Sequence, residues 1–534
     1  MGALSADNFT VTPNPLESRG GQIPVTISGM FPEKYMQRKA VVTITPELRT
    51  AGAKQQGQPY TFQGERVQGN DYSISYRLGG RYTMKADFAY QPEYLSSDLY
   101  LTFNARIGKK TINIPEVKIA HGTIATSELY RLTMFSNGGC LAPDSFQHSR
   151  QMRQEANIKF LVNEANLRKS ELQNNSVQEF VRLLKKINTD RELNIKNVEV
   201  QAYASPEGGF DFNDRLANRR QNVSEGYVKE QLQQTGLKTN VDARYTAQDW
   251  EGFQQLVQAS NIQDKDVILR VLSMYKDPAE RERQIRNMSE GFQELANGIL
   301  PELRRSRLII NYETVGRTDE EIERTFTTEP AQLTADELLY LAATKTDTAE
   351  KKTIYEKTAQ LYPTDYRPLN NLATLALAQG QEETALDYLR QALRVNPNAA
   401  EPLANLGLLQ LKSGNLQEAE GNIAKATRTG NVSEAIGILS LAKGNYAQAV
   451  KDFGAVATNN MALAQLLNKE YGNAAMTLEK IPNPDALTDY LRAILAARRG
   501  NQYAVSANLK DAIKKDPALA SYAENDLEFS NFKK

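Results

Sequence analysis

Hydrophobic and polar residues alternate one by one in several short runs of the first 120 residues. The runs are "QIPVTISGM", "AVVTITPEL", "DYSISYRLGG", "RYTMKADFAY" and "DLYLTFNARIG", and Gly, Pro and Asn separate them. A period of two places successive side chains on opposite faces, as in a strand with one buried face. Residues 1–120 are therefore predicted to form an antiparallel β-sandwich of immunoglobulin-like size, which we interpret as an interaction module.

Residues 334–534 follow helical spacing instead, and their pattern repeats. "PLNNLATLALAQGQEETALDYLRQALRVNPN" is followed by "PLANLGLLQLKSGNLQEAEGNIAKATRTGN". Pairs of like residues lie 34 positions apart, namely Gly380 and Gly414, Ala385 and Ala419, Leu372 and Leu406, and Ala392 and Ala426. This period, with small residues where two helices cross, resembles the tetratricopeptide (TPR) family. We expect five or six helix pairs, stacked into an all-α superhelix with a concave groove.

Asn371 and Asn405 occupy equivalent places on successive first helices of these repeats. The resemblance implies a groove that binds peptides or proteins, and some members of the family use such an asparagine to bind a peptide carboxylate. The two residues are therefore candidates for contacts in the groove. The alternative is an asparagine that only packs helices together.

Strand-like and helix-like patterns alternate between residues 152 and 317. Strand-like runs are "NIKFLVNEANL", "NVEVQAYA", "KTNVDARY" and "SRLIINYE", and "SVQEFVRLLKKI" and residues 213–232 have helical spacing. This order predicts a central α+β domain with helices on one small sheet. Residues from about 249 to 302, which include the only tryptophan, are expected to form a packed helical insertion, with a ligand gate as the alternative. Residues 121–151 and 318–333 are predicted to be linkers.

The corner "AYASPEGGFDFNDRLANRR" resembles the OmpA-like peptidoglycan-binding domain, together with the order of elements around it. The family signature runs from an aromatic-Thr-Asp corner through Gly and Asn-x-x-Leu to an Arg-Arg pair. The residues in register with it are Tyr203, Gly208, Asn213, Leu216, Arg219 and Arg220. The resemblance implies that the corner aspartate and the second arginine bind the amine and carboxylates of diaminopimelate in the wall peptide. Arg220 matches that arginine, whereas Ser205 replaces the aspartate.

The missing aspartate predicts weakened binding to peptidoglycan. A charge-assisted contact to an ammonium group contributes about 1.5–3 kcal/mol, which the neutral hydroxyl of Ser205 replaces only in part. Glu207, two residues further on, is the alternative partner for the ammonium. The "SPEG" corner also resembles a variant form of the domain in envelope proteins of anaerobic Gram-negative bacteria. The candidate peptidoglycan-binding residues are Tyr203, Ser205, Glu207, Asn213 and Arg220.

Arg220 lies on the apolar stripe of its predicted helix. Leu216, Arg220, Val223 and Tyr227 are spaced by four, three and four positions, so the arginine is expected to face the sheet. A buried guanidinium without a partner would cost several kcal/mol. Two partners are consistent with the sequence, either Glu207 in a structural ion pair or the carboxylate of a bound ligand.

Composition narrows the classes of function. The chain has 64 Lys and Arg and 64 Asp and Glu, so bulk charge does not favour nucleic acid or an anionic membrane surface. Cys140 is the only cysteine, which excludes an internal disulfide and a cysteine-based zinc site. His121 and His148 have neither metal-ligand spacing nor a nucleophile motif beside them. We predict no catalytic residue, no metal and no cofactor.

These patterns together predict a non-enzymatic scaffold, and the resemblance to the OmpA-like and TPR families implies that it belongs to the Gram-negative envelope. The location that the resemblance implies is the periplasm, in association with the outer membrane, and no transmembrane segment is expected. The first residues carry no leader pattern, so the chain is expected to be either cytosolic or a mature form. The expected partners are peptidoglycan, weakly bound, and a protein in the TPR groove, such as an outer-membrane complex or an exported protein. The alternatives are a cell-wall enzyme, either an amidase or a glycosidase, and a periplasmic chaperone for exported subunits.

Overall fold

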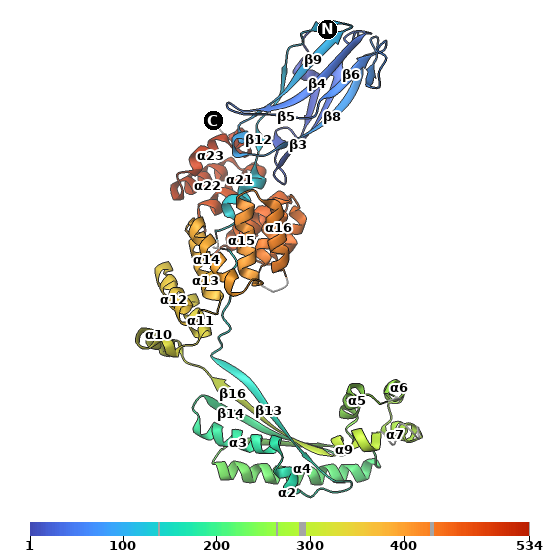
Figure 1. Cartoon of the computed structure of the whole chain (residues 1–534), viewed down its shortest axis with the longest axis vertical. Helices are drawn as coiled ribbons and strands as arrows, with labels where there is room; N and C mark the ends of the chain where they lie inside the picture. The colour runs from blue at the N-terminus through green and yellow to red at the C-terminus, as the bar shows by residue number, and fades with distance from the viewer. Residues whose placement is uncertain (137–138, 263–264, 288–294, 428–431, 533–534) are drawn as a thin grey trace. The chain divides into compact units, whose positions relative to one another are not determined.

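The computed structural model describes residues 1–136, 139–262, 265–287, 295–427 and 432–532 (Figure 1). The chain forms two compact units, which are Met1–Asp144 with Ala331–Lys534 (unit 1) and Ser145–Pro330 (unit 2). Unit 1 is therefore discontinuous in sequence, and unit 2 is inserted into it. The predicted combination of a sheet-rich N-terminal region and a C-terminal all-helical repeat superhelix is confirmed.

The N-terminal part of unit 1 consists of two sheets around one core. In β8 the alternation is visible directly, because Tyr82, Met84, Ala86 and Phe88 are buried between exposed neighbours. Residues of both sheets share this core, among them Ile27 and Val42. One sheet has the order β1 (Phe9–Thr12), β3 (Gln22–Phe31), β8 (Gly80–Ala89). The other has the order β10 (Lys110–Ile112), β9 (Asp98–Ile107), β4 (Ala40–Arg49), β6 (Tyr60–Gly64), β7 (Tyr72–Ile74), with β11 (Val117–His121) beside β9 and β5 (Lys54–Gln56) beside β4. A parallel pair of β2 (Leu16–Glu17) and β12 (Thr123–Ile124) completes this part.

The C-terminal part of unit 1 is an array of helix pairs. Ala385 and Ala419, which are 34 residues apart, are fully buried in the core of the array, as the TPR pattern predicts. Residues 428–431 and 533–534 of the predicted array lie outside the described residues. The first helices of the pairs are α11 (Ala335–Thr344), α13 (Arg367–Ala378), α15 (Ala400–Lys412), α17 (Ser433–Ala442), α19 (Asn459–Leu467) and α21 (Ala486–Arg498). The second helices are α12 (Thr348–Leu361), α14 (Glu382–Val395), α16 (Leu416–Ala426), α18 (Tyr446–Phe453), α20 (Tyr471–Lys480) and α22 (Gln502–Lys515), and α23 (Leu519–Asn525) and η6 (Leu527–Phe532) follow.

Residues 126–144, which we call the strap, pack against these helices. The strap contains η3 (Thr126–Leu129) and α1 (Tyr130–Thr133), and it belongs to the stretch 121–151 that was predicted to be a linker. Its apolar side chains Leu129, Met134, Phe135 and Cys140 share the core of the repeats. Residues 137–138 lie outside the described residues. The strap therefore packs as part of unit 1.

Unit 2 has a four-stranded sheet with helices on one face. Its order is β13 (Ser149–Lys159), β16 (Arg305–Val315), β14 (Leu193–Tyr203), β15 (Asn240–Thr246), and only β14 and β15 are parallel among the described pairs. Helices α3 (Asn175–Thr189) and α4 (Phe210–Thr235) cover one face, and short α2 (Lys169–Leu172) precedes α3. Gly236, with a φ of 75°, ends α4 in the left-handed conformation.

The predicted helical insertion has a hydrophobic core of its own. Phe253, Ile268 and Leu303 contribute to it. Parts of the insertion, residues 263–264 and 288–294, lie outside the described residues. Its described elements are α5 (Trp250–Ala259), α6 (Lys265–Met274), α7 (Pro278–Arg286), η4 (Leu295–Ile299) and α9 (Leu300–Leu303). The second predicted linker, 318–333, contains the helix α10 (Asp319–Thr328). No helix within the described ranges is both long enough and apolar enough to cross a bilayer.

Candidate functional site

Asn405, one of the two groove candidates, binds a complete peptide unit of the strap. Its Oδ1 accepts a hydrogen bond from the backbone N–H of Cys140 at 2.7 Å, and its Nδ2 donates to the carbonyl of Cys140 at 2.9 Å. The side chain is 0% exposed. Nδ2 also donates to Oδ1 of Asn370, whose own Nδ2 donates to the Cys140 carbonyl.

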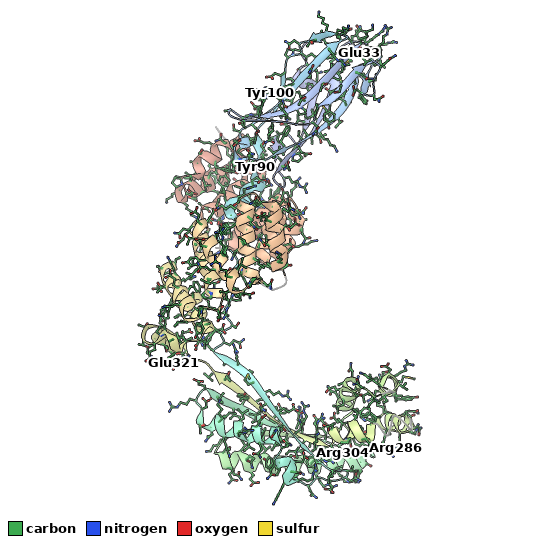
Figure 2. All side chains as sticks on the ribbon, viewed as in Figure 1. Glu33, Tyr90, Tyr100, Arg286, Arg304 and Glu321 are labelled. Carbon is green, nitrogen blue, oxygen red and sulfur yellow. The ribbon has the colours of Figure 1, made fainter. Side chains whose placement is uncertain are left out.

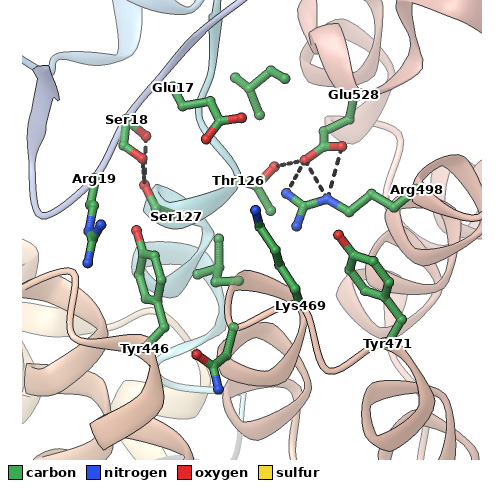
Figure 3. A pocket seen from close by; sticks show the side chains of 13 residues that line it. Glu17, Ser18, Arg19, Thr126, Ser127, Tyr446, Lys469, Tyr471, Arg498 and Glu528 are labelled. Atoms are coloured by element: carbon green, nitrogen blue, oxygen red, sulfur yellow. Dashed lines mark hydrogen bonds and ion pairs between the residues drawn. The ribbon is translucent and has the colours of Figure 1, made fainter. Parts of the chain in front are cut away.

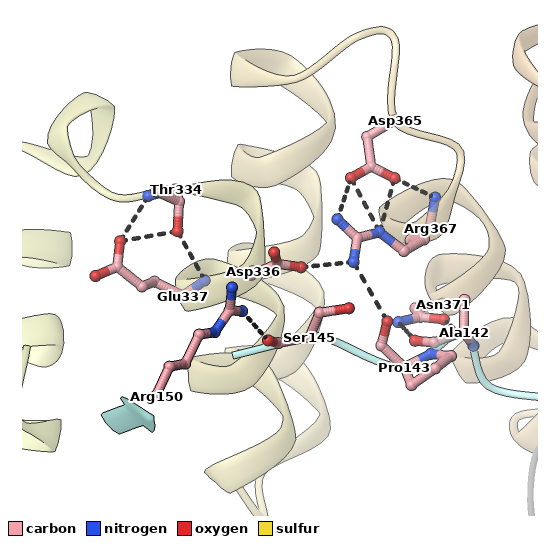
Figure 4. Close-up of polar contacts among 10 residues, drawn as sticks. All are labelled: Ala142, Pro143, Ser145, Arg150, Thr334, Asp336, Glu337, Asp365, Arg367 and Asn371. Carbon is pink, nitrogen blue, oxygen red and sulfur yellow. Dashed lines mark hydrogen bonds and ion pairs between the residues drawn. The ribbon is translucent and has the colours of Figure 1, made fainter. Parts of the chain in front are cut away.

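Asn371, the second candidate, repeats this arrangement two residues further along the strap. Its Oδ1 accepts from the N–H of Ala142 and its Nδ2 donates to the carbonyl of Ala142, both at 2.9 Å (Figure 4). An amide side chain carries a donor and an acceptor, so it can satisfy both main-chain groups of one residue. The 34-residue repeat places the two asparagines on neighbouring first helices, and the strap extends across both of them.

Gly139 allows the strap to approach this closely. A Cβ atom at Gly139 would lie 2.6 Å from Oδ1 of Asn405, and its φ of 93° is one that side chains with a Cβ rarely adopt. Further along the array, Asn460 of α19 donates to the carbonyl of Thr133 at 3.3 Å and accepts from the Thr133 hydroxyl. We call the face formed by the first helices α13, α15, α17 and α19 the inner face.

An arginine stabilises the last part of the strap. Arg367, at the start of α13, donates to Asp336 at 2.6 Å, to Asp365 at 2.7 Å and to the carbonyl of Pro143 at 3.5 Å (Figure 4). The hydrogen bonds that Arg367 donates to Asp365 and Asp336 raise the pKa of Arg367 above its usual value. The inner face is thus occupied by the chain itself from Thr133 to Pro143, outside residues 137–138.

The contacts of the inner face are mostly to main-chain groups. Such bonds do not select the strap by its side chains, because every non-proline residue offers an N–H and a carbonyl. Cys140 is 3% exposed, and burial raises the pKa of its thiol to about 12. Its side chain therefore fills the core as a small apolar group.

The five corner candidates of unit 2 come together in space, but they bind one another. Asn213 donates to the carbonyls of Ser205 at 3.0 Å and Gly208 at 2.9 Å, which fixes the turn. The Ser205 hydroxyl donates to Glu207 at 2.8 Å, and the Tyr203 hydroxyl donates to Gln201 at 2.9 Å. Ser205 and Asn213 are both buried.

Arg220 does not form the ion pair with Glu207 that was one of the two alternatives from the sequence. It is 1% exposed, and its guanidinium donates to the carbonyls of Glu164 at 2.9 Å, Tyr203 at 2.9 Å and Leu161 at 3.1 Å. The group also lies over the ring of Phe160, 5.0 Å from the centroid. Burial and the nearby Arg304 lower the pKa of Arg220 to about 10, while Glu207 opposes this shift, so the group stays charged at neutral pH.

Glu207 pairs with an arginine that sequence reasoning did not select. Arg304, labelled in Figure 2 and located just before β16, donates from Nε at 2.7 Å and from Nη2 at 3.0 Å to the two carboxylate oxygens. Burial raises the pKa of Glu207, but the hydrogen bonds from Arg304 and Ser205 outweigh it, so the pKa is below its ordinary value. The charged groups of Glu207 and Arg220 are therefore both paired within the chain.

Some of the contact residues that sequence reasoning missed carry a recognisable sequence pattern, and others do not. An Asn-Asn pair occurs in "PLNNLA" and again in "TNNMAL", so Asn370 and Asn460 carried a signal. Arg304 carried none, because it lies 97 residues from its partner inside "LRRSR". Within the described ranges, no group of three or more His, Cys, Asp and Glu is placed to bind a metal ion.

No family model matches the chain. A curated relative, Photosystem I assembly protein Ycf3 of Synechococcus sp. (strain CC9605), is 38% identical over 60 residues, which cover 11% of this chain and 35% of that protein. Among solved structures, a tetratricopeptide repeat protein from Parabacteroides merdae ATCC 43184 is 20% identical, covers 39% of this chain and 90% of its own, and has a TM-score of 0.29. PilF of Pseudomonas aeruginosa is 19% identical, with 41% of this chain and 100% of its own covered and a TM-score of 0.27. The chain thus spans about a third of Ycf3, and the OmpA-like resemblance stays a prediction.

Proposed function

We propose that this chain is a non-catalytic scaffold protein of the Gram-negative envelope, in the periplasm and close to the outer membrane. Its repeats bind its own strap, and a protein partner binds surfaces of the repeats that the strap leaves open. The observation that carries this proposal is the pairing of Asn371 and Asn405 with Ala142 and Cys140. These bonds occupy the groups that would otherwise bind an extended segment of a partner.

The open surface that we assign to the partner lies on the second helices. Tyr503 of α22 is 86% exposed and Met476 of α20 is 52% exposed. Large aromatic and methionine side chains are enriched at protein interfaces, and an exposed apolar residue costs little to desolvate when a partner covers it. A chaperone that binds extended segments on the inner face would first have to displace the strap, which disfavours that alternative.

The non-catalytic role is supported by the chemistry of the reactive side chains. His121 pairs with Asp98 at 2.6 Å and His148 with Asp319 at 3.2 Å, and all four residues are on exposed or partly exposed positions. Cys140 is buried and protonated, so it is not available as a nucleophile. An amidase or a glycosidase would need an activated nucleophile, a metal or paired carboxylates in a cleft.

The envelope location rests on the sequence resemblance of the corner. Binding to peptidoglycan through the corner is expected to be weak, because Ser205, Glu207 and Arg220 are already paired. Pulldown on purified sacculi checks this, with Ser205→Asp beside the wild type. Tight binding of the wild type would contradict the structural role that we give to the corner.

The partner surface is tested by affinity purification from native envelopes with the full-length protein. Tyr503→Ala together with Met476→Ala should reduce recovery of the partner, whereas Asn371→Ala should leave it unchanged. Lys425→Ala, an exposed change on α16, serves as the control. The reactivity of the Cys140 thiol reports in each variant whether the strap is still bound. Loss of the partner in Asn371→Ala with an unreactive Cys140 would place the partner on the inner face and overturn the proposal.

A further inference from the structure

A cavity of about 640 Å³ lies within unit 1, between the strand β2, the strap and the helices α18 to α21 (Figure 3). This volume is in the range of sites for small molecules. Five charged side chains line it, together with the rings of Tyr446 and Tyr471. The charged residues are Glu17, Arg19, Lys469, Arg498 and Glu528.

Two of these charges neutralise each other. Arg498 donates to Glu528 from Nε at 3.1 Å and from Nη2 at 2.5 Å, and the hydroxyl of Thr126 also donates to Glu528 at 2.5 Å. This group forms a fixed part of the wall. Arg498 and Glu528 are therefore not the residues that a ligand would engage.

The other charged residues are Arg19, Lys469 and Glu17. Together they give the cavity one net positive charge. Arg19 uses Nε, which donates to the carbonyl of Gly444 at 3.2 Å, and its guanidinium lies 5.5 Å from the ring centroid of Tyr446. The side chains of Lys469 and Glu17, both at exposed positions, form no hydrogen bond or ion pair with the part of the chain that the structure describes. Figure 3 shows Lys469 reaching into the cavity between Tyr446 and Tyr471.

Lys469 also occupies a position at which other repeats have a glycine in the left-handed conformation. Four other first helices, α13, α15, α17 and α21, are followed by a glycine with a positive φ: Gly380 (71°), Gly414 (84°), Gly444 (72°) and Gly500 (71°). Lys469 occupies the same place after α19 with a φ of 62°. The N–H of Glu470 closes the same turn on the carbonyl of Gln465 at 2.8 Å. A left-handed residue with a Cβ is strained, and such strain is typical of functional positions.

From these observations we infer that the cavity binds a small polar ligand through an anionic group, a carboxylate or a phosphate. Lys469 and Arg19 supply its charge partners, and Tyr446 and Tyr471 flank it. Glu17 accepts from a donor group elsewhere on the same ligand. The lysine is retained at a position that favours glycine because its ammonium is needed in the cavity. This inference concerns a site separate from the partner surface proposed above.

The experiment is a titration of the full-length protein with inorganic phosphate and with citrate, at constant ionic strength, followed by isothermal calorimetry. We expect saturable binding of at least one probe, and the stronger one tells whether phosphate or carboxylate is preferred. Lys469→Gly should weaken binding at least tenfold, the expected loss of one charge-assisted hydrogen bond. Lys469→Arg should keep the affinity within about threefold, since it keeps the charge.

The glycine variant separates binding from folding. Lys469→Gly restores the residue of the other repeats, so its melting temperature should not fall, and Lys425→Ala on the outside of the array should bind like the wild type. The absence of saturable binding to the wild type would overturn the inference. Equal affinity in the wild type and in Lys469→Gly would overturn it as well.

Discussion

The inner face of the repeats and the corner of unit 2 both use polar side chains to pair buried main-chain groups, but with different chemistry. Each contains residues of a type that binds ligands, and each uses them on the chain's own main chain. An asparagine offers a donor and an acceptor, so Asn405 satisfies both groups of Cys140 with one neutral side chain. A guanidinium offers only donors, so Arg220 needs three carbonyls and a buried charge.

This difference between amide and guanidinium indicates in which region a segment from another molecule could replace the chain's own main chain. Any extended segment presents the N–H and carbonyl that an asparagine binds, so the inner face is chemically able to accept another chain in place of the strap. The carbonyls around Arg220 belong to the end of β14 and to the segment of Leu161 and Glu164, and no incoming ligand offers the same set. We therefore expect the corner to be a fixed element of the fold and the strap to be the element that can open.

The largest effect is expected for Arg220→Met, which breaks the corner. Three carbonyls lose the guanidinium as a donor, and that of Leu161 keeps a second one, the N–H of Glu164. At about 1–3 kcal/mol for each of the other two groups, unit 2 should lose about 2–6 kcal/mol of stability. Urea unfolding followed by the fluorescence of Trp250, the only tryptophan of the chain, reports on unit 2. Arg219→Met, at the exposed neighbouring position, is the control. An unchanged urea-unfolding transition of Trp250 in Arg220→Met would contradict the structural role that we assign to the guanidinium.

Asn405→Ala breaks the inner face instead and should have the second-largest effect. It leaves the N–H of Cys140 unpaired, while the Cys140 carbonyl keeps the amide of Asn370 as a donor, and the unpaired N–H favours opening of the strap by about 2 kcal/mol. The Cys140 thiol should then react with a disulfide reagent about 30-fold faster, since opening exposes it and restores an ordinary thiol pKa. Asn422→Ala on α16, which loses only a hydrogen bond to Gln410, should leave the rate unchanged. Equal rates in Asn405→Ala and the wild type would show that the amide pair does not hold the strap.

The pH dependence of Glu207 extends the comparison, because the pair of Glu207 and Arg304 depends on charge and the amide contacts of Asn371 and Asn405 do not. The folded pKa of Glu207 is below the unfolded value of about 4.5, so its contribution is present above that value and is lost as pH falls through the folded pKa. Glu207→Gln should cost unit 2 about 1–2 kcal/mol at pH 7 and much less at pH 3. The check is urea unfolding of both proteins at the two pH values. An equal loss of unfolding free energy at pH 3 and pH 7 would mean that the charge of Glu207 does not contribute to stability through Arg304.

The smallest effect, and a stabilising one, is expected for Lys469→Gly. Lys469 contrasts with Arg220 as a cation that has no internal partner in the described ranges, and the left-handed conformation costs a residue with a Cβ about 1 kcal/mol. The variant should gain about that amount of stability by thermal unfolding. Gly414→Lys, with a φ of 84° and no atom within 4 Å of its Cβ position, should lose a similar amount. A destabilised Lys469→Gly would show that the ammonium has a partner that stabilises the fold.

Much of the fold and part of the candidate site follow from patterns in the sequence. The period of two in the first 120 residues reflects one buried face per strand, and the 34-residue period reflects the stacking of like helix pairs. Both signals are repeated many times, which makes them easy to detect. The same repetition places Asn371 and Asn405 on one face, and the spacing of Leu216 and Arg220 places the arginine under the sheet.

What binds those residues was decided only by the tertiary structure. Asn371 and Asn405 bind the main chain of the strap more than 200 residues earlier, and the strap carries no side-chain pattern that marks it as their partner. Arg220 binds carbonyls, which every residue has, and the sequence does not tell which of them lack a donor. Glu207 binds Arg304 because the sheet brings β16 beside β14. Periodicity can be detected in the sequence because it depends on neighbouring residues. The pairing of main-chain groups and of distant charges depends instead on which segments the fold brings together.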